Sequence, residues 1–365
     1  MLIPTPENFA ALKDCCEAVR DSRKPPFYWV GAGASAWCGL PLWSQLADKT
    51  YQKFQSRLKP DQREQAQSAI DAGRFPTFFS LCKAVDSQLY LRTIVDELQT
   101  PSVVPRVYDR FITEICAVRP ALIITTNADQ CLEQHSDLPA VLYQDIEQIM
   151  RDTYAGGCIL KLHGCTSVTN SLIFTEEDYQ RLIKQPGLLA SLEQLFSSRT
   201  AIFIGYGMRD EYVLKCLRQA HSNRPLLGAG PHFCLLQAET SCEIGGNVHL
   251  IRYDLRPHPD HRSCIQVIEE IRRSREASSS KPPAEAPSRR SAHILSDIFL
   301  PGTNQTSYTV KLKSPDGKES RIEVGCGFVD SELAHLGTTA MHDTVVGLLC
   351  FDHLIAPTTI LGKLK

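Results

Sequence analysis

The chain has 365 residues, of which 43% are hydrophobic and 22% are charged, and its formal net charge is −2. These values are typical of a globular protein with one large domain and a smaller one, or two domains. The near-neutral charge gives no reason to expect direct nucleic-acid binding or a membrane surface. No apolar run could span a bilayer, and residues 1–16 lack the pattern of a signal peptide. We therefore expect a cytoplasmic protein.

The 14 cysteines do not form a metal-binding pattern, because no two of them are spaced as Cys-x-x-Cys. Most lie inside apolar segments, as Cys116 and Cys234 do. Free cysteine packs as a small buried hydrophobe, and disulfides follow oxidising compartments. We predict reduced structural thiols and no metal site.

Short apolar strands alternate with helices through the first 273 residues. This alternation predicts an α/β domain with a Rossmann-like parallel sheet and helices on both faces. The helices are expected over residues 7–22, over most of 43–98 with breaks at Pro60 and Pro76, over 106–118 and over 261–273. The strands are expected at Phe27–Val30, Ala121–Ile124, Cys158–Leu162, Ala201–Ile204, His232–Leu236 and Val248–Tyr253.

The remaining residues predict a linker and a small module. Residues 274–292 contain almost no large apolar side chain, which is typical of a flexible linker. Residues 308–313 and 321–324 alternate polar and apolar side chains around a turn at 314–317, and so predict a β-hairpin. We expect residues 293–365 to form a small β-rich interaction module beside the 1–273 domain.

A glycine-rich turn, Gly31-Ala32-Gly33-Ala34-Ser35, follows the first strand directly. Between a strand and a helix, such a turn lets backbone N–H groups approach a pyrophosphate. Gly31 and Gly33 would allow the turn, and Ser35 would donate its hydroxyl group. The same pattern is often only a tight loop, so the motif alone leaves both interpretations open.

Polar residues also follow the second and third predicted strands, Ala121–Ile124 and Cys158–Leu162. Asn127 and Asp129 come after Ala121–Ile124, at the end of a parallel strand where ligands bind. Either residue could instead cap the next helix. His163 ends the following strand and is suited to proton transfer near neutral pH, or is a loop histidine with a structural partner.

A fourth turn, Gly205-Tyr206-Gly207, follows the strand at 201–204. Its glycines could admit the adenosine half of a dinucleotide close to the backbone. Asp210 could hold a ribose hydroxyl, or it could cap the helix that begins near Glu211.

Together the four turns resemble a known family. In chain order they are GAGAS followed by Gly39-Leu40-Pro41, then TTNAD at 125–129, KLHG at 161–164 and IGYG at 204–207. This order resembles the sirtuin superfamily. It is most similar to the sirtuin-like (Sir2-type) NADase effectors of bacterial antiphage defence, such as those of Thoeris and HerA-linked systems. The resemblance covers about residues 1–273 and leaves the tail unassigned.

The resemblance implies NAD as substrate and a role for each turn. It implies that Asn127 positions the attacking water, that His163 accepts a proton, and that Asp129 orients the nicotinamide or its ribose. The expected contacts with NAD are Gly31, Ala32, Gly33, Ser35, Thr126, Gly205, Tyr206 and Asp210.

Two departures from protein-deacylating sirtuins favour hydrolysis of NAD. Deacylases usually carry a four-cysteine zinc module after the His-Gly turn, whereas this chain has only Cys165 before Cys216. They also carry an acidic-Phe-Arg element where this chain has Leu42-Trp43-Ser44. We therefore expect an NAD⁺ hydrolase without zinc. An NAD-dependent deacylase and a non-catalytic sensor of NAD or ADP-ribose are the alternatives.

Unrestrained NAD hydrolysis would harm the host cell. We therefore expect a gated effector of antiphage defence that is activated as a homo-oligomer and/or by a partner protein, such as a HerA-like ATPase or another defence component. The linker and the small module suggest that residues from 293 onward take part in this control.

Overall fold

The computed structural model describes residues 2–20, 24–146, 157–208, 210–227, 231–240, 248–256, 261–279, 293–294, 307–313 and 319–325. The chain divides into two compact units, Met1–Ser280 and Lys281–Lys365. Among the described residues, no helix combines the length and the apolar character that a membrane span needs.

The first unit is built on a seven-stranded sheet in which every neighbouring pair of strands is parallel. The strand order is β3-β4-β2-β1-β5-β6-β7. The strands are β1 (Phe27–Val30), β2 (Leu122–Thr125), β3 (Ala140–Leu142), β4 (Ile159–Lys161), β5 (Ala201–Ile204), β6 (His232–Gln237) and β7 (Val248–Tyr253). The predicted parallel sheet is confirmed. The edge strand β3 was missed because its apolar run is only three residues long; in the structure these residues are partly exposed.

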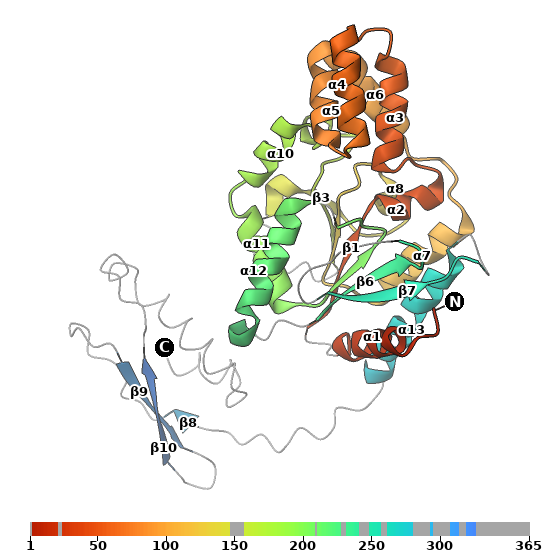
Figure 1. The fold of residues 1–365 in the computed structure, drawn as a ribbon. Helices are drawn as coiled ribbons and strands as arrows, with labels where there is room; N and C mark the ends of the chain where they lie inside the picture. The colour runs from red at the N-terminus through yellow and green to blue at the C-terminus, as the bar shows by residue number, and fades with distance from the viewer. Residues whose placement is uncertain are drawn as a thin grey trace. The chain divides into compact units, whose positions relative to one another are not determined.

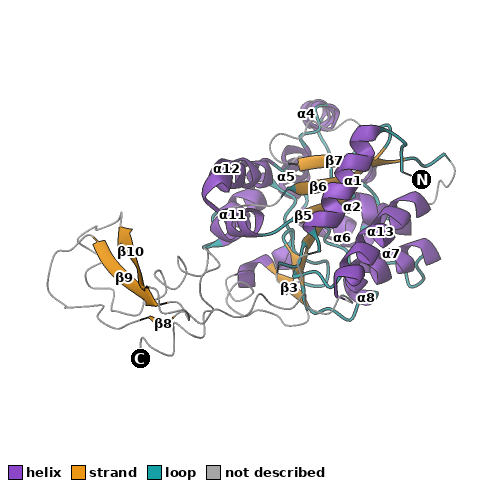
Figure 2. Cartoon of the chain, turned by 90° about the horizontal axis from the view of Figure 1, so that it is seen from below, coloured by secondary structure: helices purple, strands orange, loops and turns teal. Residues whose placement is uncertain are grey.

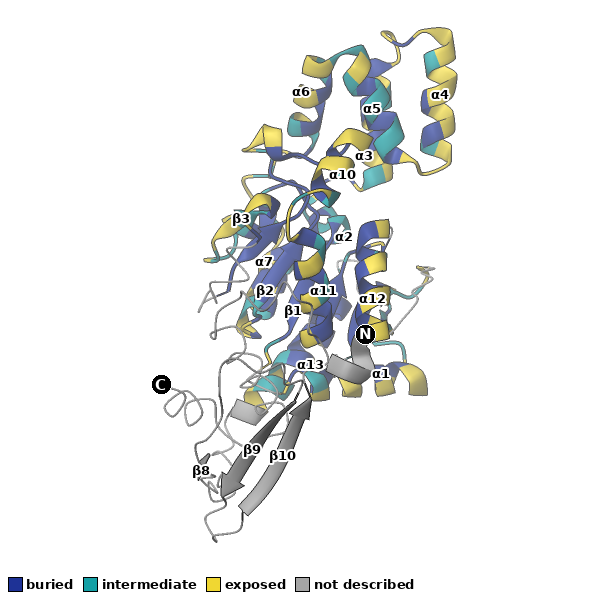
Figure 3. Cartoon of the chain, turned by 90° about the vertical axis from the view of Figure 1, so that its left-hand side faces the viewer, coloured by how far each residue is buried: buried dark blue, intermediate teal, exposed yellow. Residues whose placement is uncertain are grey.

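Helices cover both faces of this sheet (Figures 1 and 2). Successive residues of a strand point to opposite faces, so Tyr28 and Val30 pack on one side of β1 while Phe27 and Trp29 pack on the other. The first face is covered by α1 (Pro6–Ala18), α7 (Arg106–Ala117) and α13 (Arg262–Ser279). The second face is covered by α10 (Glu176–Ile183), α11 (Leu188–Ser198) and α12 (Glu211–Leu227). These helices turn a buried side toward the sheet and an exposed side outward (Figure 3).

Four helices form a separate cluster at one end of the sheet (Figures 1 and 3). They are α3 (Trp43–Phe54), α4 (Pro60–Asp71), α5 (Phe75–Val85) and α6 (Ser87–Glu97). The expected breaks at Pro60 and Pro76 are confirmed, since each proline lies in the first turn of a helix, where its missing N–H costs nothing. Their apolar core includes Ala128 and Phe174 from the loops after β2 and β4. The cluster therefore packs over the carboxyl ends of those strands.

The helix α13 continues to Ser279, so the predicted end of this helix at Arg273 is wrong. Arg272 pairs with Glu276 one turn later at 2.7 Å, and the guanidinium of Arg275 donates to the carbonyl of Val19. The polar composition of 274–279 is thus that of a helix surface rather than of a linker. The rest of the expected linker, residues 280–292, lies outside the described residues.

The second unit contains a three-stranded antiparallel sheet in the order β10-β9-β8. Its strands are β8 (His293–Ile294), β9 (Ser307–Lys313) and β10 (Glu319–Gly325). The predicted hairpin is confirmed, because β9 and β10 pair from Ser307↔Gly325 to Lys313↔Glu319. The expected turn at 314–317 and residues 326–365 of the module lie outside the described residues.

Candidate functional site

The four polar turns begin at the same level of the sheet. Val30 at the end of β1 is in register with Thr125 of β2 and with Ile204 of β5. Thr125 is in turn in register with Lys161 of β4. The Thr125 hydroxyl also donates to the Val30 carbonyl at 2.8 Å. The turns at 31–35, 126–129, 162–164 and 205–208 therefore leave one edge of the sheet side by side, where open parallel sheets bind ligands.

Glycines allow two of these turns to pack backbone against backbone. The N–H of Gly31 donates to the Ile204 carbonyl at 2.9 Å, and the N–H of Gly33 donates to the Gly205 carbonyl at 2.8 Å. A Cβ added at Gly33 would lie 2.9 Å from the Gly205 Cα. Gly31 and Gly33 thus pack closely against the turn that begins at Gly205, and the Gly33 N–H is engaged by the Gly205 carbonyl. Their contact with NAD stays a prediction.

Asn127 links the second turn to the first. Its Nδ2 donates to the Gly31 carbonyl at 3.0 Å and to the Ser35 Oγ at 2.8 Å. A carbonyl only accepts hydrogen bonds, so the contact with Gly31 fixes which end of the amide faces the loop. The opposite atom, Oδ1, is buried and has no partner in the part of the chain that the structure describes.

A hollow of about 340 Å³, open mouth included, lies beside Asn127. The hollow is lined by Ala32, Ser35, Pro41, Trp43, Leu46, Leu98, Thr126, Asn127, Ala128, Asp129 and Phe174. Five of the predicted site residues thus line one hollow. Among the described residues that line the hollow, Asn127 Oδ1 is the only buried side-chain nitrogen or oxygen atom without a hydrogen-bond partner.

Asp129 comes immediately before Gln130, the N-cap residue of α8 (Cys131–Gln134). Its Oδ1 accepts from the backbone N–H of Cys131 at 3.0 Å, so Asp129 binds the first residue of α8 without being its N-cap. The residue also lines the hollow.

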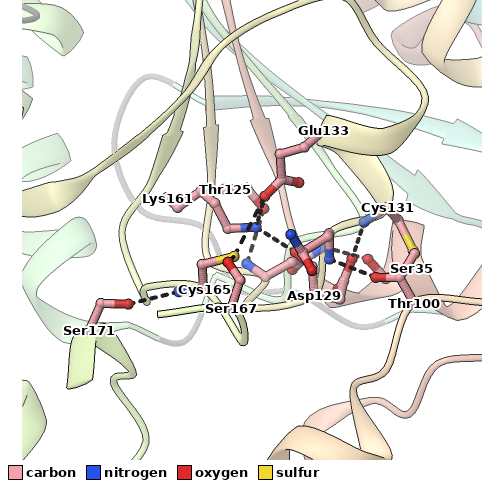
Figure 4. Close-up of polar contacts among 12 residues, drawn as sticks. Ser35, Thr100, Thr125, Asp129, Cys131, Glu133, Lys161, Cys165, Ser167 and Ser171 are labelled. Atoms are coloured by element: carbon pink, nitrogen blue, oxygen red, sulfur yellow. Dashed lines mark hydrogen bonds and ion pairs between the residues drawn. The ribbon is translucent and has the colours of Figure 1, made fainter. Parts of the chain in front are cut away.

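A buried ion pair lies behind this turn (Figure 4). The ammonium of Lys161, only 1% exposed, contacts the carboxylate of Glu133 and the backbone carbonyl of Asp129. Burial raises the pKa of the Glu133 carboxyl, and Lys161 counteracts that shift. The sequence analysis did not predict this pair. A lysine at the end of an apolar strand is nevertheless a signal for one, because a buried ammonium group needs a partner.

His163 is fully buried and belongs to a second group of residues. Its Nε2 is 3.1 Å from the Tyr212 hydroxyl and 3.9 Å from Asp210 Oδ1. The Asp210 carboxylate accepts from the hydroxyl of Tyr179 at 2.9 Å and from that of Tyr206 at 2.6 Å. Burial lowers the pKa of His163, and the Asp210 charge opposes this. The other ring nitrogen, Nδ1, has no partner among the described residues.

The predicted site residues therefore fall into two groups, and Trp43 contacts both. Trp43 lines the hollow beside Asn127. The centroids of the Trp43 and His163 rings are 6.1 Å apart, and the two rings meet edge to face. Tyr206 and Asp210 contact each other beside His163, and their expected contact with NAD stays a prediction. We missed Trp43, Tyr179 and Tyr212, because aromatic residues at helical spacing are indistinguishable from core residues in the sequence.

Comparison with known proteins bears on both groups. Residues 121–247 match the family model of the SIR2-like domain. SIR2-like domains bind NAD, so the match indicates an NAD-related function. The SIR2-like match starts just before β2 and includes Asn127, His163 and Asp210, whereas the turn at 31–35 lies outside it. No curated protein matches the sequence. The described residues hold no cluster of three or more histidine, cysteine, aspartate or glutamate side chains suited to a metal ion.

Proposed function

We propose that this chain hydrolyses the nicotinamide–ribose bond of NAD⁺, so that NAD⁺ and water give nicotinamide, ADP-ribose and a proton. The SIR2-like match supports NAD as the ligand. The observation that carries the proposal is the unpartnered Asn127 Oδ1 beside the hollow. A buried acceptor without a partner costs about 1–3 kcal/mol, which a bound water or ribose hydroxyl would recover.

Buried polar atoms without partners occur elsewhere, at Tyr28 and Trp29 for example. Those two side chains belong to the apolar clusters on either face of the sheet and do not line the hollow. Asn127 differs because its amide is held by Gly31 and Ser35. Its carbonyl oxygen is therefore fixed in place to accept a hydrogen bond from a ligand.

In this reaction nicotinamide leaves as a neutral molecule, so no strong acid is required. The enzyme must stabilise an oxocarbenium-like transition state and deliver water. Asn127 Oδ1 would accept a hydrogen bond from that water. His163 would accept its proton, and the lowered pKa of His163 keeps the ring neutral at pH 7 and able to do so. The proton then passes to solvent.

We further propose that the enzyme is gated. His163 has no exposed surface, and Trp43 lies against it, so the ring must be uncovered before NAD can reach it. The likeness to antiphage effectors supports activation by self-assembly or by a defence partner, with cellular NAD depletion as the outcome.

The test is to incubate the purified full-length chain with NAD⁺ over a wide range of protein concentrations and to measure nicotinamide by chromatography. Asn127→Ala and His163→Ala should each lower the rate by about 10²-fold or more. The exposed residues Asn170 and His221 supply matched controls, Asn170→Ala and His221→Ala, which should retain the full rate.

Three results would contradict the proposal. Unchanged activity in either site variant would remove the assigned role. Acyl-peptide turnover equal to NAD loss would identify a deacylase. NAD binding, measured by calorimetry, without nicotinamide release under every activating condition tried would identify a sensor.

A further inference from the structure

We propose that Asp210, held by Tyr179 and Tyr206, is a positioning residue that sets the proton on Nε2 of His163 and leaves Nδ1 free to act as the base. This inference rests on the proposed NAD hydrolysis. It assigns to Asp210 a role at the imidazole, not a contact with the adenosine ribose.

The argument begins with the geometry of the carboxylate. Tyr179 on α10 donates to Oδ1 at 2.9 Å, and Tyr206 in the glycine turn donates to Oδ2 at 2.6 Å. Burial raises the pKa of both tyrosines well above the usual value, so both hydroxyls stay protonated and donate. Each carboxylate oxygen is therefore fixed by a separate element of the fold.

The tautomer of His163 follows from its two nitrogens. A neutral imidazole carries its proton on one nitrogen and accepts on the other. Nε2 lies 3.1 Å from the Tyr212 hydroxyl and 3.9 Å from Asp210 Oδ1. A negative charge at that distance favours the proton on Nε2, whose N–H donates to the Tyr212 oxygen. Nδ1, which has no partner in the described part of the chain, is then the acceptor.

The groups around the ring support Asp210 as the controlling charge. The described side chains that face His163 are Trp43 from α3, Tyr179 from α10, Tyr212 from α12 and Asp210 from the turn before α12. With the tyrosines protonated, Asp210 is the charged member of this set. Its side chain is 15% exposed, so water screens its charge weakly.

The experiment compares Asp210→Asn with wild type in the full-length chain. Removing the charge should lower the pKa of His163, so the acid limb of kcat against pH moves to lower pH. The maximal kcat should fall about 10- to 100-fold, because His163 becomes a weaker base and its two tautomers mix. This loss is no larger than the rate enhancement that a positioned general base usually supplies. KM for NAD⁺ should stay within about twofold of wild type, since Asp210 would not touch the substrate.

Supporting variants separate positioning from folding. Asp210→Glu keeps the charge and should restore part of the pH profile. Tyr206→Phe should shift the profile in the same direction as Asp210→Asn but less. Asp137→Asn, at an exposed position, and Tyr51→Phe, on α3 away from His163, are the matched controls and should change neither kcat nor KM. Thermal unfolding of each variant shows whether it is folded.

A second readout does not depend on activity. Nitrogen-15 NMR of histidine-labelled protein reports which imidazole nitrogen is protonated, and His163→Gln assigns the signal. Wild type should show the proton on Nε2, and Asp210→Asn should show mixed tautomers. A tenfold rise in KM with unchanged kcat in Asp210→Asn would overturn the inference in favour of ribose binding. An unchanged His163 tautomer in Asp210→Asn would also overturn it. Absence of nicotinamide release by wild type would instead contradict the proposed function, while the NMR result would still decide the role of Asp210.

Discussion

Replacing Gly205 by alanine tests whether the two glycine turns hold each other in place. Gly205 has φ of +63°, and an added Cβ would lie 2.4 Å from the Ala34 nitrogen and 2.9 Å from the Gly33 carbonyl carbon. Both contacts are with backbone atoms, which cannot rotate away. The left-handed conformation alone costs a residue with a Cβ about 1–2 kcal/mol, and overpacking adds about 1–3 kcal/mol. The free energy of unfolding should therefore fall by about 2–5 kcal/mol.

Gly73 supplies a matched control, because its φ is +66° and no atom lies within 4 Å of an added Cβ. Gly73→Ala therefore carries the conformational cost without the collision, and should lose only about 1–2 kcal/mol. The difference between the two variants isolates the contact between the turns.

Urea unfolding followed by tryptophan fluorescence is the assay. All three tryptophans, Trp29, Trp37 and Trp43, lie in the first compact unit, so the signal reports that unit alone. With a slope of about 3 kcal/mol per molar urea, a loss of 3 kcal/mol moves the midpoint by about 1 M. Equal midpoints for the two variants would refute the packing of the turns described above.

Three further outcomes are expected. Lys161→Met should destabilise the first unit by about 3–5 kcal/mol at pH 7, because it leaves Glu133 buried and unpaired. In urea unfolding, the double variant with Glu133→Gln should recover part of the lost free energy of unfolding. No recovery would argue against the ion pair. The pKa of His163 is lowered from 6.5 in the folded chain, so the unfolded chain binds the extra proton first and stability should fall as pH drops below about 6.5. His163→Gln should flatten this part of the stability–pH curve, and an unchanged curve would show that other groups cause it. Truncation after Ser280 should leave NAD binding, measured by calorimetry, unchanged. It should alter how activity, measured as nicotinamide release, depends on protein concentration. An identical concentration dependence would exclude the second unit from control of the activity.

The sheet was predictable because its strands are continuous apolar runs that the parallel arrangement buries on both faces. The runs at Phe27–Val30 and Ala201–Ile204 match β1 and β5 residue for residue. The edge strand β3 is also apolar in sequence, but it has only three residues, too few to be distinguished as a strand. The end of α13 was missed because charged residues that pair along a helix have the composition of a linker.

The candidate site was predictable as four turns, but not as two groups. Strand register places polar residues at one edge, and register follows from the apolar pattern. Which residues lie behind others depends on long-range packing. Tyr179 and Tyr212 reach His163 only because α10 and the start of α12 lie against the turn after β4. No local pattern in the sequence encodes that contact.

The separation into two groups has a consequence for how a ligand could enter. Asn127 faces an open hollow, whereas His163 is wholly buried; Trp43 lines that hollow and its ring lies against the His163 ring. Trp43 is the first residue of α3, and α3 packs with α5 and α6 in a cluster of its own rather than in either face of the sheet. The same cluster also packs on Ala128 and Phe174, which come from the loops after β2 and β4. In the gating that we propose, a shift of the cluster would therefore move the indole and act directly on the turn that carries Asn127 and Asp129.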